Sequence, residues 1–150
     1  MMISIALYKP DIPQNTAAIL RLSACLKIKV HIIEPCAFNL ADPRFRRVIM
    51  DYNRFITLKK YHDYDSFDND NHKSRIILMT TKGKKYYHKF KFHKDDILLY
   101  GNESSGVPMF IHKKIKTKLK IPMSKKTRSL NISSAVAISA SEALRQTDQI

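Results

Sequence analysis

Glycine is scarce in this chain: only three of its 150 residues are glycine, and tryptophan is absent. With so few glycines, no G-x-G-x-x-G fingerprint follows the first apolar segment, which argues against a dinucleotide-binding Rossmann site. The segment 101–106 has the glycine spacing of a P-loop, but it lacks the Lys and Ser or Thr that complete that motif. The sequence therefore does not support triphosphate hydrolysis.

The chain has only two cysteines, and its histidines do not cluster. Cys25 and Cys36 form neither a C-x-x-C motif nor a zinc-ligand spacing. Cys25 lies in an apolar helical stretch, so we expect a buried free thiol there. The six histidines are scattered, and none is paired at i and i+4 with an acid between them. We therefore expect no metal site.

The chain also lacks any long apolar run. None approaches the roughly 18 residues that a membrane-spanning helix requires. The segment Met1–Tyr8 has no basic region and no small-residue cleavage site of the kind found in signal peptides. These features predict a soluble cytoplasmic protein with no membrane partner.

Acidic residues are outnumbered by basic ones, 13 against 27, which gives a formal net charge of +14. A strongly positive chain attracts polyanions and releases their counterions on binding, so nucleic acid is the favoured partner. The alternative is that lysine is simply abundant and forms a solvated surface. The candidates for RNA phosphate contacts are Arg44, Arg46, Arg47, Lys82, Lys84, Lys85, Lys89 and Lys91, with Tyr86 and Tyr87 as candidates for base stacking.

The order of apolar patterns predicts an α/β fold in a single domain that spans residues 1–150. Short apolar runs alternate with stretches in which apolar residues recur every three or four positions. The expected strands are Met2–Leu7, Lys29–Ile33, Ile56–Leu58, Arg75–Thr80, Asp96–Tyr100 and Leu119–Ile121. The expected helices are Pro13–Leu26, Pro43–Met50, Asp63–Asn69, Pro108–His112 and Asn131–Gln146.

All three glycines, Gly83, Gly101 and Gly106, fall in loops that follow predicted strands. Ligands of open α/β sheets bind at the carboxyl ends of the strands, and glycine lets the backbone approach a ligand closely. These loops are therefore expected to form the rim of a ligand site. Ordinary turn glycines are the alternative.

Three segments occur in an order and at spacings that are typical of one family. The first is Pro13–Thr16, with Arg21 further along the same helix, and the second is Leu99–Pro108. The third joins Ile121–Met123 to Arg128–Ala135. Each segment alone is weak evidence for a family, but together they resemble the three motifs of the SPOUT, or α/β-knot, RNA methyltransferases.

The likeness is closest to the TrmL branch of that superfamily, whose members methylate the wobble ribose of tRNA. The likeness extends from about Ile3 to Gln146. One departure from it is Ser105, which stands where relatives usually carry arginine. Further segments that carry the likeness are Tyr8–Thr16, Ile33–Pro35, Arg46-Arg47, Asp51-Tyr52 and Thr80–Gly83.

The resemblance implies a parallel sheet flanked by helices, a deep trefoil knot at its C-terminal end, and a homodimer. Knots are exceptions to the rules of chain connection, so residue patterns alone do not predict one. The implied reaction transfers a methyl group from S-adenosyl-L-methionine to the 2′-hydroxyl of nucleotide 34 of tRNA and leaves S-adenosyl-L-homocysteine. Leucine isoacceptors are the expected substrates, with cytidine or uridine at the wobble position.

By position, the resemblance also implies three groups of site residues and no metal. The cofactor contacts are expected at Met79, Gly101, Ile121, Ser129 and Leu130. The catalytic group is Arg21, Asn15, Ser129 and Asn131. The substrate-binding group is Arg44, Arg46, Arg47, Lys82 and Glu103.

Arg21 is the main catalytic candidate. A ribose 2′-hydroxyl is a poor nucleophile at neutral pH, so catalysis needs alignment of the oxygen, methyl and sulfur atoms and assistance with the proton. A guanidinium group normally stays protonated, so bidentate positioning of the neighbouring phosphate is easier for Arg21 than acting as a base. For Asn15 and Asn131 the alternative role is helix capping, and for Glu103 it is an exposed loop acid.

Two other functions remain open from the sequence. A non-catalytic RNA-binding module would explain the charge but not the cofactor loops, and binding of S-adenosylmethionine separates the two. A ribosomal RNA 2′-O-methyltransferase of the same superfamily is the other alternative. Such enzymes often carry an added RNA-binding domain, for which this chain has no room.

Overall fold

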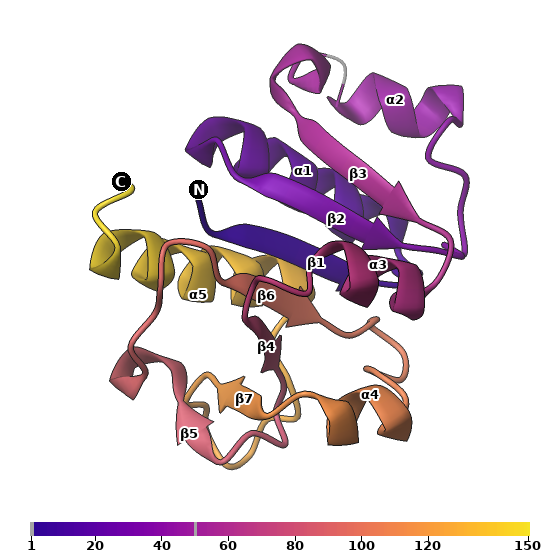
Figure 1. The fold of residues 1–150 in the computed structure, drawn as a ribbon. Helices are drawn as coiled ribbons and strands as arrows, with labels where there is room; N and C mark the ends of the chain where they lie inside the picture. The colour runs from indigo at the N-terminus through magenta and orange to yellow at the C-terminus, as the bar shows by residue number, and fades with distance from the viewer. Residues whose placement is uncertain (1, 50) are drawn as a thin grey trace.

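The computed structural model describes residues 2–49 and 51–150 and consists of a seven-stranded sheet between layers of helices (Figure 1). The strands are β1 (Ser4–Tyr8), β2 (Lys29–Ile33), β3 (Thr57–Tyr61), β4 (Ile76–Met79), β5 (Lys85–Tyr86), β6 (Ile97–Tyr100) and β7 (Thr117–Lys120). The α-helices are α1 (Pro13–Leu26), α2 (Pro43–Ile49), α3 (Tyr64–Asp70), α4 (Met109–Lys114) and α5 (Ile132–Gln146). Short 3₁₀ turns occur at η1 (Asn53–Phe55) and η2 (Tyr87–Lys89).

The strands lie in the order β3-β2-β1-β6-β4-β7-β5, and every neighbouring pair is parallel. From β1 the chain builds outward through β2 to β3, whereas the later strands are added on the other side of β1. The order therefore reverses between β1 and β6. In open parallel sheets ligands bind beside such a reversal, at the carboxyl ends of the strands.

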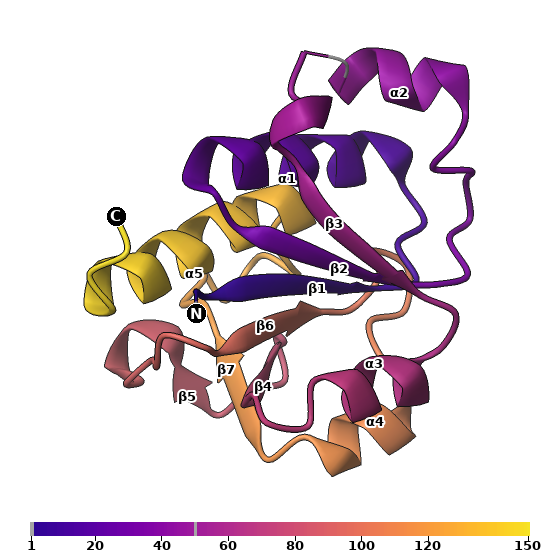
Figure 2. The same cartoon turned by 45° about the horizontal axis from the view of Figure 1, so that its top comes forward.

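Both faces of the sheet are buried, and successive side chains alternate between them. In β1, Ile5 and Leu7 join the apolar cluster on one face, whereas Ala6 and Tyr8 join the cluster on the other. Helices α1 and α5 cover the first face and α3 and α4 the second, as Figure 2 shows. In the described part of the chain, no helix is both long enough and apolar enough to cross a membrane.

The predicted elements are confirmed in kind and order, whereas the ends of most of them differ by one to three residues. Strand β3 extends beyond the predicted segment Ile56–Leu58, and strand β7 begins and ends earlier than the predicted segment Leu119–Ile121. Both differences arise because lysines interrupt the apolar runs of these strands. The short edge strand β5 was not predicted at all. The last residue of the predicted helix Pro43–Met50 lies outside the described residues, and α2 is assigned to Ile49.

The expectation of a buried Cys25 is wrong, because its side chain is exposed. Ala18, Arg21 and Cys25 recur at intervals of three and four residues and form the outer face of α1. The buried face of this helix includes Leu20 and Ser23 instead. The apolar composition of the stretch did not reveal which face packs on the sheet.

His31 is a buried titratable residue on β2. Its ring stacks on that of Tyr61 at 5.7 Å and meets the ring of Phe67 edge-on at 5.6 Å. The Nδ1 atom of His31 lies 3.2 Å from the Tyr61 hydroxyl, which donates a hydrogen bond to Asp70. Burial lowers the pKa of His31 to about 4, and the positive charges of Lys29 and Lys59 act in the same direction.

We expect the free energy of unfolding to fall by about 3 kcal/mol between pH 7 and pH 4 on account of His31. The unfolded chain takes up a proton on this histidine near pH 6.5, whereas the folded protein resists it until about pH 4. The stabilisation is therefore present above pH 6.5 and is lost as the pH falls. Urea unfolding across this range measures it, and His31→Leu should flatten the dependence while His62→Leu, at an exposed site, should not. An unchanged slope in His31→Leu would contradict the assignment.

Candidate active site

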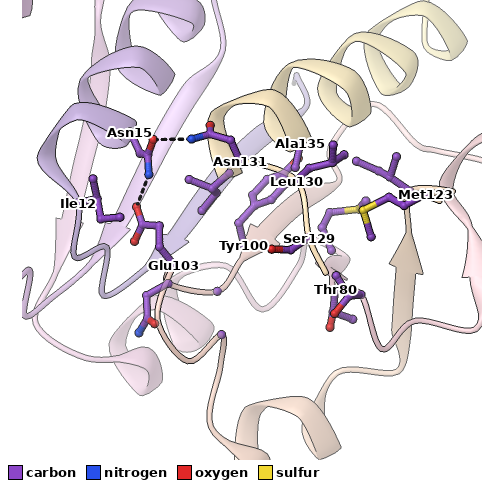
Figure 3. A pocket seen from close by; sticks show the side chains of 17 residues that line it. Ile12, Asn15, Thr80, Tyr100, Glu103, Met123, Ser129, Leu130, Asn131 and Ala135 are labelled. Carbon is purple, nitrogen blue, oxygen red and sulfur yellow. Dashed lines mark hydrogen bonds between the residues drawn. The ribbon is translucent and has the colours of Figure 1, made fainter. Parts of the chain in front are cut away.

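A cavity of about 470 Å³ opens at the carboxyl ends of β4, β6 and β7 (Figure 3). This volume lies within the range of small-molecule sites. The lining comes from the start of α1, the loops after these three strands, and the start of α5. Its residues are Ile12, Asn15, Met79, Thr80, Thr81, Tyr100, Gly101, Asn102, Glu103, Gly106, Ile121, Met123, Ser129, Leu130, Asn131, Ile132 and Ala135.

The loop after β6 closes on itself at one side of the cavity. Asn102 and Gly106 exchange two backbone hydrogen bonds of 3.1 and 3.0 Å. A Cβ atom on Gly101 would lie 2.5 Å from the Cα of Gly106, so only glycine fits there. Gly106 itself has a φ of +69°, in the left-handed region that favours glycine. These two glycines shape the rim of the cavity by making the loop tight.

Gly83 differs from the other two, because it does not line the cavity. A Cβ atom at Gly83 would lie 2.7 Å from the carbonyl carbon of Leu119. This glycine therefore lets the chain after β4 pack closely on β7. The expectation that all three glycines mark a ligand rim is wrong for Gly83, where the close approach is to the protein's own backbone.

Three polar side chains from distant parts of the chain form one wall of the cavity. The amide nitrogen of Asn131 donates to the side-chain oxygen of Asn15 at 2.9 Å, and the amide nitrogen of Asn15 donates to Glu103 at 3.3 Å. Figure 3 shows these bonds joining α1, the loop after β6 and the start of α5. The wall therefore brings together one residue from each of the three motif segments.

Asn131 also caps the last helix. Its side-chain oxygen accepts from the backbone nitrogens of Ser133 at 2.9 Å and Ser134 at 3.4 Å. Such a bond satisfies amide groups that the first helical turn leaves free. The capping alternative and the site role coexist in this residue, since its oxygen holds α5 while its nitrogen holds Asn15.

Glu103 is the ionisable group in this wall. Its carboxylate accepts the backbone N–H of Asp11 at 3.0 Å in addition to the Asn15 amide. Burial raises the pKa of the Glu103 carboxyl, and the neighbouring Asp11 carboxylate raises it further. The hydroxyl of Ser104 donates to Asp11, which ties the same loop to the segment before α1.

Tyr100 provides a buried aromatic surface at the end of β6. Its hydroxyl lies 2.6 Å from the Ser139 hydroxyl, which donates to the carbonyl of Ala135. Burial raises the pKa of Tyr100, so this phenol stays protonated. The residue therefore acts as part of the cavity wall, with its polar atom bonded to α5.

The structure brings most of the implied site residues together. All five implied cofactor contacts and three of the implied catalytic residues line the cavity, together with one implied substrate residue. They are Met79, Gly101, Ile121, Ser129, Leu130, Asn15, Asn131 and Glu103.

Five implied residues lie outside the cavity: Arg21, Arg44, Arg46, Arg47 and Lys82. Arg46 and Arg47 are exposed on α2, and Lys82 is exposed in the loop after β4.

Arg21 and Arg44 line a second hollow of about 520 Å³ between α1 and α2. The guanidinium of Arg21 lies over the ring of Tyr52, with its central carbon 4.7 Å from the ring centre. Arg44 pairs with Asp42 at 3.0 Å and is almost fully exposed. The main catalytic candidate therefore belongs to a surface beside the cavity.

Sequence reasoning missed several lining residues, among them Thr80, Met123 and Ala135. Thr80 is the last residue of the predicted strand Arg75–Thr80, and that position was the available signal, since strand ends line ligand sites in this type of sheet. Met123 and Ala135 stand at the ends of the two parts of the third motif segment, and that was the only signal for them, because a methionine in a loop and an alanine in a helix are common anywhere. Among residues 2–49 and 51–150, no three His, Cys, Asp or Glu side chains are grouped so as to hold a metal ion.

Comparison with known proteins decides the family. Residues 2–141 match the SpoU rRNA Methylase family, which is nearly the whole chain. This chain belongs to the SpoU methylase family. The match confirms the resemblance to the RNA methyltransferases that the three motif segments carry.

Relatives of this SpoU protein match it over nearly their full length. The tRNA (cytidine(34)-2'-O)-methyltransferase of Beijerinckia indica is 42% identical over 144 residues, which cover 95% of this chain and 90% of that protein. A solved structure from work on the 2-OH methylation of C/U34 on tRNA is 34% identical, with a TM-score of 0.92. It covers 97% of this chain and 95% of that one.

A more distant structure shares the fold alone. The AdoMet-bound rRNA methyltransferase from Sinorhizobium meliloti is 20% identical, with a TM-score of 0.87, and the match covers 96% of this chain but 56% of that chain. The predicted parallel sheet flanked by helices is confirmed. The shared fold implies the C-terminal knot that the sequence resemblance predicted.

Proposed function

We propose that this SpoU protein transfers a methyl group from S-adenosyl-L-methionine to the 2′-hydroxyl of nucleotide 34 of tRNA, cytidine or uridine, in leucine isoacceptors. The observation that carries the proposal is the wall of Asn15, Glu103 and Asn131, which unites all three motif segments at one cavity. Relatives named for this reaction match the chain almost end to end. A tRNA substrate would place the activity in the cytoplasm.

The cavity suits an adenosine-like cofactor by size and by lining. Met79, Ile121 and Leu130 offer apolar surface for a flat base, and Ser129 offers a hydroxyl for a sugar or an amino-acid group. Gly106 also lines the cavity and carries no side chain, so its backbone can approach the ligand closely. When bound, S-adenosylmethionine supplies an activated methyl group on a sulfonium.

The polar wall can position a ribose. Each asparagine amide nitrogen carries two hydrogens and uses one of them in the Asn131–Asn15–Glu103 chain, which leaves a donor on both residues. Donors held by fixed partners orient a hydroxyl more accurately than mobile side chains do. We therefore assign Asn15 and Asn131 to holding the target ribose, with Glu103 fixing Asn15.

Arg21 has a different task in this proposal. It follows Asn15 by six residues on the same helix, a rise of about 9 Å. A group at that distance from the ribose site suits the phosphate next to the target nucleotide, which a planar guanidinium binds with two hydrogen bonds. We therefore propose that Arg21 positions the RNA backbone.

The choice of tRNA over ribosomal RNA rests on how much of each relative's length this chain covers. The tRNA methyltransferase relative is covered to 90%, whereas the ribosomal RNA enzyme from Sinorhizobium meliloti is covered to 56% and has further chain beyond this domain. The tRNA methyltransferase relative, matched almost end to end, is therefore the better guide to the substrate. The anticodon loop, which contains nucleotide 34, is the proposed target.

The test of the function is methyl transfer from tritiated S-adenosylmethionine to tRNA transcripts, with nucleosides identified by mass spectrometry. The matched control is the same tRNA with a 2′-deoxynucleotide at position 34, which should accept no methyl group. Ribosomal RNA fragments serve as the alternative substrate. If calorimetry detects no binding of S-adenosylmethionine, the proposed reaction is refuted, and a non-catalytic RNA-binding module is the remaining function.

We also propose a homodimer, and expect light scattering at micromolar concentration to give twice the mass of the chain. Helices α1 and α5 pack against each other. Their exposed residues include the small side chains of Ala18 and Ser134 and the apolar Ile138. A stable interface buries about 1,600 Å² in total. Ile138→Glu should shift the protein to monomer, whereas Phe110→Glu, on the opposite face of the sheet, should not. Only monomer in the wild-type protein would contradict the proposal.

A further inference from the structure

An exposed aromatic pair lies at the outer edge of the sheet, next to the candidate active site. The rings of Tyr86 in β5 and His88 in η2 stack 5.7 Å apart with an interplanar angle of 12°. Both side chains are exposed, and 37% of Tyr86 is accessible to solvent. The pair is therefore a flat surface open to solvent, outside both apolar clusters of the sheet.

Lysines surround this pair. The ammonium groups of Lys120 and Lys89 lie 5.2 and 5.9 Å from the centre of the Tyr86 ring. Residues 82–94 include six lysines and no aspartate or glutamate. The nearby acid on α5, Glu142, is held by Arg145 at 2.8 and 2.9 Å, so its charge is already compensated. The surface around the aromatic pair is therefore strongly positive.

The aromatic pair is close to the cavity. Tyr86 pairs with Lys120 in the register of β5 and β7, and the next residue along the chain, Ile121, lines the cavity. Neighbouring strands lie about 4.8 Å apart and consecutive Cα atoms about 3.8 Å apart, so the Cα atoms of Tyr86 and Ile121 are within about 9 Å. An RNA chain whose target nucleotide enters the cavity can therefore place a neighbouring nucleotide on the aromatic pair.

We propose that Tyr86 and His88 form a stacking platform for an unpaired nucleobase of the substrate RNA, and that Lys89 and Lys120 bind the phosphates beside it. Single-stranded RNA is recognised by aromatic side chains that stack on splayed bases within a basic groove. An acidic protein partner would account for the lysines, but it would not account for two parallel exposed rings. The inference rests on the proposed function, because that function supplies the RNA.

The test measures the affinity of full-length protein for a tRNA transcript by fluorescence anisotropy. Loss of one base–aromatic stack weakens binding on the order of tenfold, so Tyr86→Ala should lower affinity by about that factor. Tyr86→Phe keeps the ring and should bind as the wild type does. Phe55→Ala is the matched control, since Phe55 is also exposed beneath a cation, Arg54, but lies near the opposite edge of the sheet. Affinity for S-adenosylmethionine should stay unchanged in all three variants.

A salt titration separates stacking from charge. Each lost phosphate contact reduces the slope of log affinity against log salt by about 0.7–0.9. Lys89→Gln and Lys120→Gln should each reduce the slope, whereas Tyr86→Ala should lower affinity without changing it. Wild-type affinity in Tyr86→Ala, or an equal loss in Phe55→Ala, would overturn the platform.

The platform and the proposed function fail in different ways. A wild-type protein that methylates tRNA, with no loss of affinity in Tyr86→Ala, refutes the platform alone. A wild-type protein that transfers no methyl group, but whose tRNA binding depends on Tyr86, refutes the proposed function and supports the platform.

Discussion

Arg21→Ala is expected to lower the rate of methyl transfer to tRNA by about 10²–10⁴-fold while leaving the affinity for S-adenosylmethionine close to that of the wild type. In the proposed reaction Arg21 holds the phosphate next to the target ribose. Without that contact the 2′-oxygen loses its alignment with the methyl group, and such a loss belongs mainly to the transition state. Tritiated methyl transfer and calorimetric titration of the cofactor measure the two quantities.

The structure explains why cofactor binding should survive the substitution. Arg21 lies on the outer face of α1 and contributes nothing to the lining of the cavity. Its guanidinium contacts the ring of Tyr52, and alanine is a good helix former at an exposed position. The helix and the wall that begins at Asn15 should therefore remain intact.

Two further variants make the test specific. Arg21→Lys keeps the charge but loses the planar arrangement of donors, so it should restore little activity if bidentate phosphate binding matters. Arg54→Ala removes another exposed arginine that stacks on an aromatic ring, that of Phe55, and should keep wild-type activity. Near-normal turnover in Arg21→Ala would exclude Arg21 from the mechanism, and lost cofactor binding would show a structural role instead.

The sequence was sufficient for the architecture because apolar periodicity determines which strands and helices are buried. Helix α1 and strand β2 have the predicted ends, since Pro13 starts the helix and Pro35 follows the strand. The edge strand β5 could not be predicted in this way. Its two residues, Lys85 and Tyr86, are exposed and contain no apolar run, and their pairing with β7 is a tertiary contact.

The candidate site was predictable only where motifs mark it. The resemblance pointed to Met79, Gly101 and Ile121, and the sheet order brings these three strand ends to one cavity. The separation of Arg21 from that cavity depends on which face α1 turns to the sheet, which the sequence pattern left open. The role of Gly83 depends likewise on β7 lying against it.

Arg75→Ala is expected to reduce the free energy of unfolding by about 3–5 kcal/mol, because it leaves a buried carboxylate without its partner. Asp96, just before β6, is fully buried. Its two carboxylate oxygens accept from the Nε and an Nη of Arg75 at 2.8 and 2.7 Å, and one of them also accepts the backbone N–H of His93 at 2.7 Å. The remaining bond to His93 cannot compensate a full charge in that position.

Urea unfolding at neutral pH measures this loss, and two comparisons identify its origin. Arg44→Ala breaks an ion pair whose arginine is 89% exposed, so it should change stability by less than about 1 kcal/mol. The double variant Arg75→Ala with Asp96→Ala should be less destabilised than the sum of the single variants, because it removes the buried charge together with its partner. If the two single losses simply add, the pair is not coupled and the destabilisation arises from lost packing of Arg75 on Phe90, whose ring centre lies 4.7 Å from the guanidinium. Because this pair joins β4 to the start of β6 at the end of the sheet opposite the cavity, the variant should lose stability without losing affinity for S-adenosylmethionine at temperatures where it stays folded.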